Sequence, residues 1–513
     1  MNAPPDETFN DLAVVVETAQ GKVRGSRQGP VSVFKGMRYG ADTSGKSRFR
    51  PPQPVSPWSG VQDALDYGPQ SPQMRGPLAD KGPMSEDCLR VNVWTPRTGQ
   101  GRRPVMLWFH GGGFEAGSAS QKVYDGARLA ARGDVVIVSI NHRLNVFGHC
   151  FLGDRLGEDY AAAGNVGYLD LIAALRWVRE NIAVFGGDPG NVTIFGQSGG
   201  GRKVSLCYAG EDARSLFQRG IVQSGSHLRV QAPEKAAQLT DALLQALDLA
   251  PSDAARLLDA PADALSAAQL KVMRETRSRF SPVLDGLAFK AHPFLPDAPK
   301  ISNHLPMMVG TTRTELSNQL GYEAGAFDLD MAELRRRLPR YVGEADVDAA
   351  IAVFQATSPE ASPSELYFKI ASARGYILDQ TIMAEQRVKA SAAPTYSYQL
   401  TWRSPAEGGR RISQHTLDLP FMFDNVAAAH HLTGPESDET GQLAHAMAQT
   451  WISFARTGDP NNDAIPPWRP YDLTDRPVML FDVPPMLAED PYADERAFMG
   501  RYDSQQMGRT LHR

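Results

Sequence analysis

A single serine stands inside a glycine-rich turn in the segment VTIFGQSGGGRKVS, residues 192–205. Gly196, Ser198 and Gly200 fill the pattern G-x-S-x-G, directly after a β-type run and before residues that can begin a helix. Such a strand-to-helix elbow lifts a serine hydroxyl clear of the sheet, and the glycines let backbone and helix approach closely. A serine attacks a carbonyl when a base removes its proton and backbone amides hold the oxyanion that forms. The segment therefore predicts Ser198 as a nucleophile.

A second glycine-rich loop lies upstream, in WFHGGGF at residues 108–114. It follows another apolar run, and an HGGG loop in this position is the separate source of oxyanion amides in esterases and lipases. Alone, such a loop could be no more than a flexible connection. Together with the elbow at Ser198, it favours an oxyanion hole.

The elements that must position these loops alternate between strands and helices. The middle β-type runs are continuously apolar, which is typical of a sheet covered on both faces. Residues 165–187 place apolar side chains at helical spacing between two runs, and residues 437–460 predict another helix, capped by Ser437 or Asp438. This order predicts an α/β fold with a mostly parallel sheet. The β-type runs are 89–94, 105–110, 135–140, 192–195, 220–226 and 307–310.

Two further ranges, about 232–275 and 325–392, are rich in Ala, Leu, Arg and Glu and carry few strand signals. We expect helical insertions there, placed to roof the site, within one large domain that spans residues 1–513.

Composition excludes several classes of partner. A net charge of -5 over 513 residues gives no sign of nucleic-acid binding, and no apolar run approaches the roughly 18 residues of a membrane span. Residues 1–25 lack the features of a secretory signal. Cys88, Cys150 and Cys207 are too few and too scattered for a disulfide framework or a zinc site. We therefore expect a cytoplasmic protein without a membrane partner or bound metal.

The motifs together resemble those of the type-B carboxylesterases, which include carboxylesterases, cholinesterases and bacterial p-nitrobenzyl esterases. The resemblance covers roughly residues 14–480. It implies a single α/β-hydrolase fold, with a mostly parallel central sheet covered by helices and helical insertions that roof a deep active-site gorge. The segments that carry it are, in order, VSVFKGMRYG, RFRPPQP, SEDCLRVNVWTP, GGGF, NHRLNVFG, GNVGYLDLIAALRWVRENIAVFGGDPGNVTIFGQSGGG, IVQSGS and PVLDG.

The resemblance implies a catalytic triad of Ser198, Glu315 and His415. Glu315 fills the family's acid position in GTTRTE, and His415 fills the position of the base in QHTLDLP. Two other acids could in principle reach the histidine. Asp418 is so close to His415 in the chain that we expect it to stabilise its own turn, and Asp285 lies in a DG pair typical of a turn.

The family pattern also implies an oxyanion hole made by the amides of Gly112, Gly113 and Gly199, with Phe114 as an apolar wall of the substrate site. Position 199 is usually alanine in the family. Because the contact there comes from the backbone, we expect alanine to be tolerated. Gln197 replaces the usual glutamate, and this removes a negative charge that would favour a cationic substrate.

Other departures concern charge and cysteine pairing. Lys203 occupies a position that is usually small, and Arg202 precedes it. The pair could contact an anionic substrate group, but a structural ion pair is the favoured interpretation. Ser71 stands where secreted relatives have the cysteine that pairs with the equivalent of Cys88.

The sequence thus predicts a serine hydrolase that cleaves small-molecule carboxylic esters through an acyl-enzyme, without a cofactor. An amide or carbamate hydrolase with the same machinery is the nearest alternative. A non-catalytic, adhesion-type binding protein is a remote one, because the chain keeps Ser198, Glu315 and His415.

Overall fold

The computed structural model describes residues 13–74, 81–99 and 101–505; the segment 1–12, on which the argument against a secretory signal depends, lies outside these ranges. The described strands form one sheet in the order β1-β2-β3-β5-β7-β6-β8-β9-β10-β11-β12-β13, with β4 paired to β2. They are β1 (Val14–Glu17), β2 (Lys22–Gln28), β3 (Val31–Arg38), β4 (Val61–Asp63), β5 (Arg90–Thr95), β6 (Arg103–Phe109), β7 (Val136–Ile140), β8 (Gly187–Gln197), β9 (Arg219–Gln223), β10 (Met307–Thr312), β11 (Thr395–Leu400), β12 (Pro477–Phe481) and β13 (Met486–Glu489).

Neighbouring strands from β7 to β12 in this order are parallel, and pairs at both ends of the sheet are antiparallel. This arrangement confirms the predicted α/β class. The described α-helices are α1 (Ala127–Gly133), α2 (Asn145–His149), α3 (Gly153–Leu156), α4 (Val166–Asn181), α5 (Gly199–Ala209), α6 (Pro233–Ala246), α7 (Ala262–Thr276), α8 (Ser317–Leu320), α9 (Met331–Arg337), α10 (Pro339–Val342), α11 (Val347–Thr357), α12 (Pro363–Ser372), α13 (Leu378–Lys389), α14 (Asp418–Met422), α15 (His430–Thr433), α16 (Asp438–Thr457) and α17 (Ala493–Met499).

The central strands are apolar throughout because both of their faces are covered. Along β6, Val105, Leu107 and Phe109 enter a core that also contains α4, whereas Met106 and Trp108 enter a core shared with α1 and α16. Successive side chains of a strand point to opposite faces, so two covered faces require an uninterrupted apolar run.

The helix α16 illustrates how local sequence sets an element's ends. The side chain of Ser437 accepts the N–H of Thr440, and Gly458 ends the helix in a left-handed conformation (φ 85°). The cap is therefore Ser437 and not Asp438, and the cap and the glycine together satisfy backbone groups that a helix leaves open at its ends.

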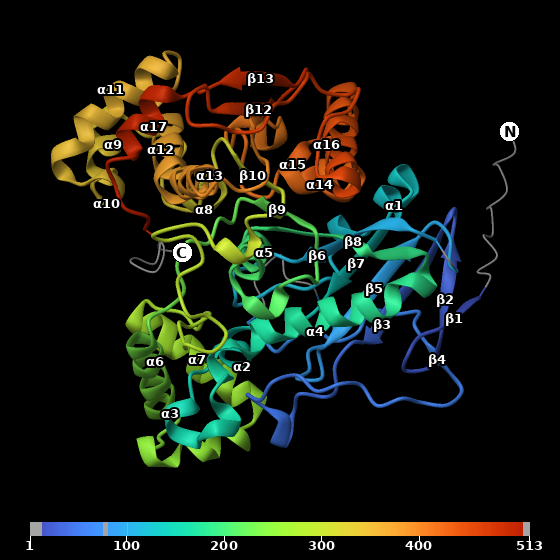
Figure 1. Ribbon diagram of the computed structural model, residues 1–513. Helices are drawn as coiled ribbons and strands as arrows, with labels where there is room; N and C mark the ends of the chain where they lie inside the picture. The colour runs from blue at the N-terminus through green and yellow to red at the C-terminus, as the bar shows by residue number, and fades with distance from the viewer. Residues whose placement is uncertain (1–12, 75–80, 100, 506–513) are drawn as a thin grey trace, which may run out of the picture.

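Helices of the two predicted insertion ranges form apolar clusters of their own. α6 and α7 pack with α2 around Leu243 and Leu265, and α9, α11 and α12 pack with α17 around Leu334 and Phe354. In Figure 1 these two groups lie on either side of α5. The helix α13 also falls in the second insertion range, but it lies against β10 and β11 and contributes Met383 to a core of the sheet.

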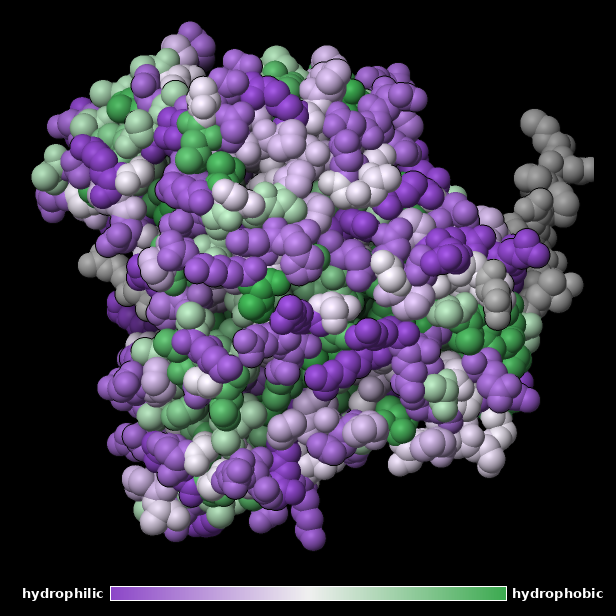
Figure 2. Space-filling model, viewed as in Figure 1, coloured by the Kyte–Doolittle hydropathy of each residue, from purple (hydrophilic) through white to green (hydrophobic). Residues whose placement is uncertain are grey.

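The surface is mostly polar on the face shown in Figure 2, with apolar side chains gathered beside β1 and β4. Val15, Val61 and Leu65 are between 44% and 49% exposed there. Within the described ranges, none of the helices combines the length and apolar character that crossing a membrane requires.

Candidate active site

Ser198 stands between β8 and α5 in a strained turn. Its φ of 58° and ψ of -121° are rare for a residue with a side chain, and its N–H donates to the carbonyl of Gln223 over 2.8 Å. The turn is tight: a Cβ on Gly196 would lie 2.8 Å from the Cα of Gly200. The predicted glycines are thus required by the close approach of strand and helix.

The glycine loop after β6 packs directly on this elbow. Gly112 and Gly113 have φ values of 91° and 67°, which favour glycine, and a Cβ on Gly111 would lie 3.5 Å from the Cβ of Ser198. Gly113 also lies against Gly199, so that the three glycines expected at the oxyanion hole are neighbours. A Cβ on Gly199 would overlap the backbone O and N of Gly113 and lie 2.6 Å from its Cα. The expectation that alanine is tolerated at 199 therefore conflicts with this packing.

Glu315 and His415 meet on loops that follow β10 and β11. A short hydrogen bond joins the Glu315 Oε2 to the His415 Nδ1, and the Glu315 Oε1 accepts the N–H of Thr312 over 2.7 Å. Thr314 and Gln414 form a β-bridge beside them, which fixes one loop against the other. Glu315 is fully buried and His415 is 5% exposed. With Nδ1 bound to the carboxylate, Nε2 is the nitrogen available for proton transfer.

Gln197 connects the elbow to the histidine. Its Nε2 lies 3.2 Å from the His415 Nε2 and 3.4 Å from Nδ1, so the amide lies alongside the imidazole. Because Gln197 is the residue before Ser198, this contact places the imidazole beside the elbow. Sequence reasoning identified the position but not the contact.

The two alternative acids have other partners. The fully buried carboxylate of Asp418 accepts from the Gln223 Nε2 over 2.7 Å and from the Tyr398 hydroxyl over 3.4 Å. Burial, with a smaller contribution from nearby Glu315, raises the pKa of Asp418 to about 6 against the hydrogen bond from Gln223. The Asp285 Oδ1 accepts three backbone N–H groups of its own turn.

Gln223 was not singled out from the sequence, although both its backbone and its side chain make hydrogen bonds at the elbow. Its carbonyl accepts the Ser198 N–H, while its side chain binds Asp418 and accepts the indole N–H of Trp451 over 3.0 Å. A glutamine at the end of a strand carries no sequence signal for such a role.

Aromatic rings surround the site. Phe114 is 5% exposed and lies edge-on to the imidazoles of His149 and His227, with ring centroids 5.4 and 5.5 Å apart. Tyr376 lies 5.1 Å from the His415 ring, and it belongs to a π-helical turn at Ala373–Ile377. Such turns often occur at functional sites, and nothing in the sequence marked this one.

Lys203 is buried beneath the glycine loop. The residue is 1% exposed, and its Nζ donates to the carbonyl of His110 over 2.8 Å. This burial does not match a substrate contact at the surface. The favoured structural ion pair is not formed either, because among the described residues the Nζ of Lys203 binds a backbone carbonyl and no carboxylate. Arg202 donates its backbone N–H to the Ser198 carbonyl over 3.1 Å.

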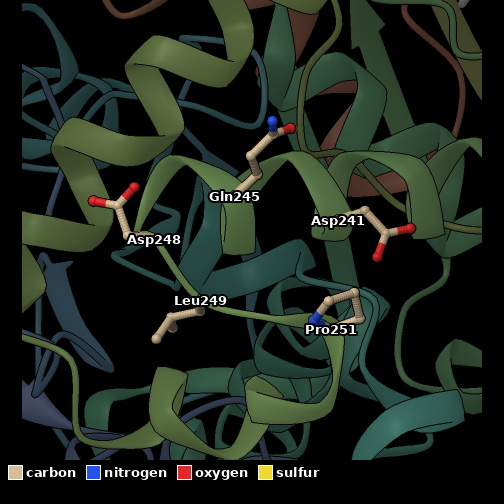
Figure 3. Close-up of a pocket in the computed structure, with 5 residues that line it drawn as sticks. All are labelled: Asp241, Gln245, Asp248, Leu249 and Pro251. Atoms are coloured by element: carbon tan, nitrogen blue, oxygen red, sulfur yellow. The ribbon is translucent and has the colours of Figure 1, made fainter.

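One cavity lies between α6 and the segment that follows it (Figure 3). It has a volume of about 560 Å³ and is lined by Asp241, Gln245, Asp248, Leu249 and Pro251. None of the predicted site residues lines it. Across the described ranges, no group of three or more His, Cys, Asp or Glu side chains is placed to hold a metal ion.

Comparison with known proteins identifies the family. The model of the carboxylesterase family matches residues 13–499. The para-nitrobenzyl esterase of Bacillus subtilis (strain 168) is 33% identical over 94% of this chain and 97% of its own length, and the liver carboxylesterase of Sus scrofa is 33% identical over 89% and 88%. A carboxylesterase structure from Geobacillus stearothermophilus superposes with a TM-score of 0.83 at 35% identity, and covers 94% of this chain and 99% of its own.

The chain therefore belongs to the type-B carboxylesterase family and has the α/β-hydrolase fold. Its activity is the hydrolysis of carboxylic esters.

Proposed function

We propose that Ser198 is the nucleophile of this esterase, His415 its general base, and Glu315 the acid that orients and stabilises the imidazole. The observation that carries the proposal is the hydrogen bond from the His415 Nδ1 to Glu315, beside the Ser198 elbow. The Nε2 of His415 takes the serine proton as the hydroxyl attacks the ester carbonyl, and returns it to the departing alcohol. Water then attacks the acyl-enzyme by the same route, and no cofactor is required.

The amides of Gly112, Gly113 and Gly199 hold the oxyanion of each tetrahedral intermediate. Their close packing supports this role, since donors fixed before the reaction need no reorganisation when charge develops. Phe114, which follows the loop directly, forms an apolar wall for the substrate. The helices of 232–275 and 325–392 roof the site as insertions of one domain.

A reducing, cytoplasmic location is consistent with the cysteines. Cys88, Cys150 and Cys207 are all free and buried, and burial raises the pKa of each thiol. Ser71, whose side chain partly offsets the raised pKa of Cys88, stands at the position where secreted relatives have the partner of this cysteine.

Replacement of the nucleophile tests the proposal. Ser198→Ala should abolish turnover of an activated ester while the circular-dichroism spectrum stays unchanged. The oxyanion hole and substrate binding alone leave roughly a thousandfold acceleration over water. Activity of the folded variant within tenfold of the parent would contradict the assignment.

A further inference from the structure

The buried ammonium of Lys203 has an unusual position for a lysine. It lies on α5, five residues after Ser198, and its hydrogen bond reaches the carbonyl of His110, the first residue of the HGGG loop. A hydrogen bond from a charged donor is roughly twice as strong as a neutral one. Lys203 thus ties the helix that begins at the nucleophile to the loop that carries Gly112 and Gly113.

The imidazoles near this ammonium are polar but uncharged. His110, His142 and His149 each direct Nδ1 to a backbone carbonyl, at 2.8, 2.8 and 3.1 Å, so that Nδ1 carries the hydrogen in each ring. The rings of His110 and His142 are stacked, with centroids 5.1 Å apart. Burial first, and then the neighbouring charge of Lys203, keeps the pKa of His110 and His142 well below the usual range. For His149, burial lowers the pKa to about 3.

Consequently the three imidazoles add no charge beside the ammonium, and none of the carboxylates in the described part of the chain forms an ion pair with it. The carboxylate of Asp170 is bound to Arg143 over 2.7 Å, and Arg202, the other charged group that acts on Lys203, is itself a cation. Burying a charge without a counter-ion costs stability, and such a charge acts strongly on its neighbours because the protein interior screens it weakly.

We propose that Lys203 is a positioning residue that strengthens the oxyanion hole. It fixes the HGGG loop through the His110 carbonyl, and its positive charge stabilises the negative charge of the tetrahedral oxyanion. The inference rests on the proposed function. The ammonium does not touch the substrate. It acts when negative charge develops on the carbonyl oxygen, so it stabilises the transition state more than the bound ester.

The test compares Lys203→Met with Lys369→Met. Methionine keeps length and apolar volume without the charge, and Lys369, on α12, is a matched control whose Nζ donates to the Ser358 hydroxyl over 2.7 Å. Loss of a direct oxyanion donor costs about 100- to 1000-fold in kcat. For Lys203→Met we expect a smaller loss of about ten- to a hundredfold, with KM unchanged, and a matching loss of affinity for a trifluoromethyl ketone that forms a tetrahedral adduct. Lys369→Met should match the parent.

A pH profile supplies a readout that a purely structural role would not change. Burial, followed by repulsion from Arg202, lowers the pKa of Lys203 to about 7. The kcat of the parent should therefore fall as the pH rises through about 7 and the ammonium loses its proton, whereas Lys203→Arg should keep its rate above this pH. If neither variant folds, the pH profile of the parent decides, and a kcat that does not fall as the pH rises through about 7 overturns the proposal.

Failure of this inference is distinguishable from failure of the proposed function. An active Ser198→Ala would overturn the nucleophile and, with it, the role of Lys203. An inactive Ser198→Ala together with a folded, fully active Lys203→Met would overturn the role of Lys203 alone. Equal changes in KM and in ketone affinity would also overturn it, because they would indicate uniform binding.

Discussion

Glu315 binds the Nδ1 edge of His415 across a β-bridge between two loops, although one hundred residues separate them in the chain. The same carboxylate accepts a backbone N–H from Thr312, at the end of the strand that precedes it. The acid is thus held by its own strand and directed at the histidine, at the carboxyl end of parallel strands where α/β sheets gather functional groups.

Glu315→Gln should lower kcat by roughly a thousandfold or more, because the amide removes the charge that stabilises the imidazolium and permits the wrong tautomer. The measurement is kcat on one activated ester, with folding checked by circular dichroism. Asp285→Asn is the control, since the Asp285 Oδ1 accepts backbone N–H groups of its own turn. A folded, inactive Asp285→Asn beside a near-normal Glu315→Gln would transfer the role to Asp285.

Gly199→Ala should reduce kcat by about 100- to 1000-fold, the cost of losing an oxyanion donor, because the new methyl group displaces Gly113. Gly441→Ala is the matched control, since a Cβ there meets nothing within 4 Å. Near-parental activity of Gly199→Ala would show that the loop has room to move without loss of the hole, as the family pattern predicts.

Asp418→Asn tests the buried carboxylate behind the elbow. The folded-state pKa of Asp418 is raised to about 6, above the ordinary value of 3.8 for an aspartate, so the native state binds a proton that the unfolded state releases between these values. The parent therefore loses stability as pH rises from about 4 to 6, by at most about 3 kcal/mol.

Asparagine cannot ionise, so the stability of Asp418→Asn relative to the parent should increase over this interval and then level off. Urea unfolding at pH 4, 5, 6 and 7 measures the difference. A difference that does not change with pH would contradict the raised pKa, whatever the constant cost of the altered hydrogen bond to Gln223.

Much of this architecture could be predicted because the signals are local. The apolar run 105–110 reflects a strand covered on both faces, and Ser437 with Gly458 marks the ends of α16. The elbow follows from Gly196 and its neighbours, since a tight strand-to-helix turn requires small residues.

The remaining features depend on contacts between distant segments. Lys203 looks like a surface or ion-paired residue in the sequence, and only the fold places it under the His110 carbonyl. The close approach of Gly113 to Gly199 likewise involves two loops that are distant in the chain. The expectation that alanine is tolerated at position 199 considered that position alone and therefore missed this contact. The π-helical turn that carries Tyr376 is an irregularity within a helical range that has no residue signature.

The most direct test of the central claim is the site at which a fluorophosphonate ester attaches. We predict that one equivalent abolishes activity and that peptide mass spectrometry places the adduct on Ser198, at the start of α5. Ser198→Ala should take up no label under the same conditions. Complete inactivation with the adduct on another residue, or stoichiometric labelling of Ser198→Ala, would contradict the account.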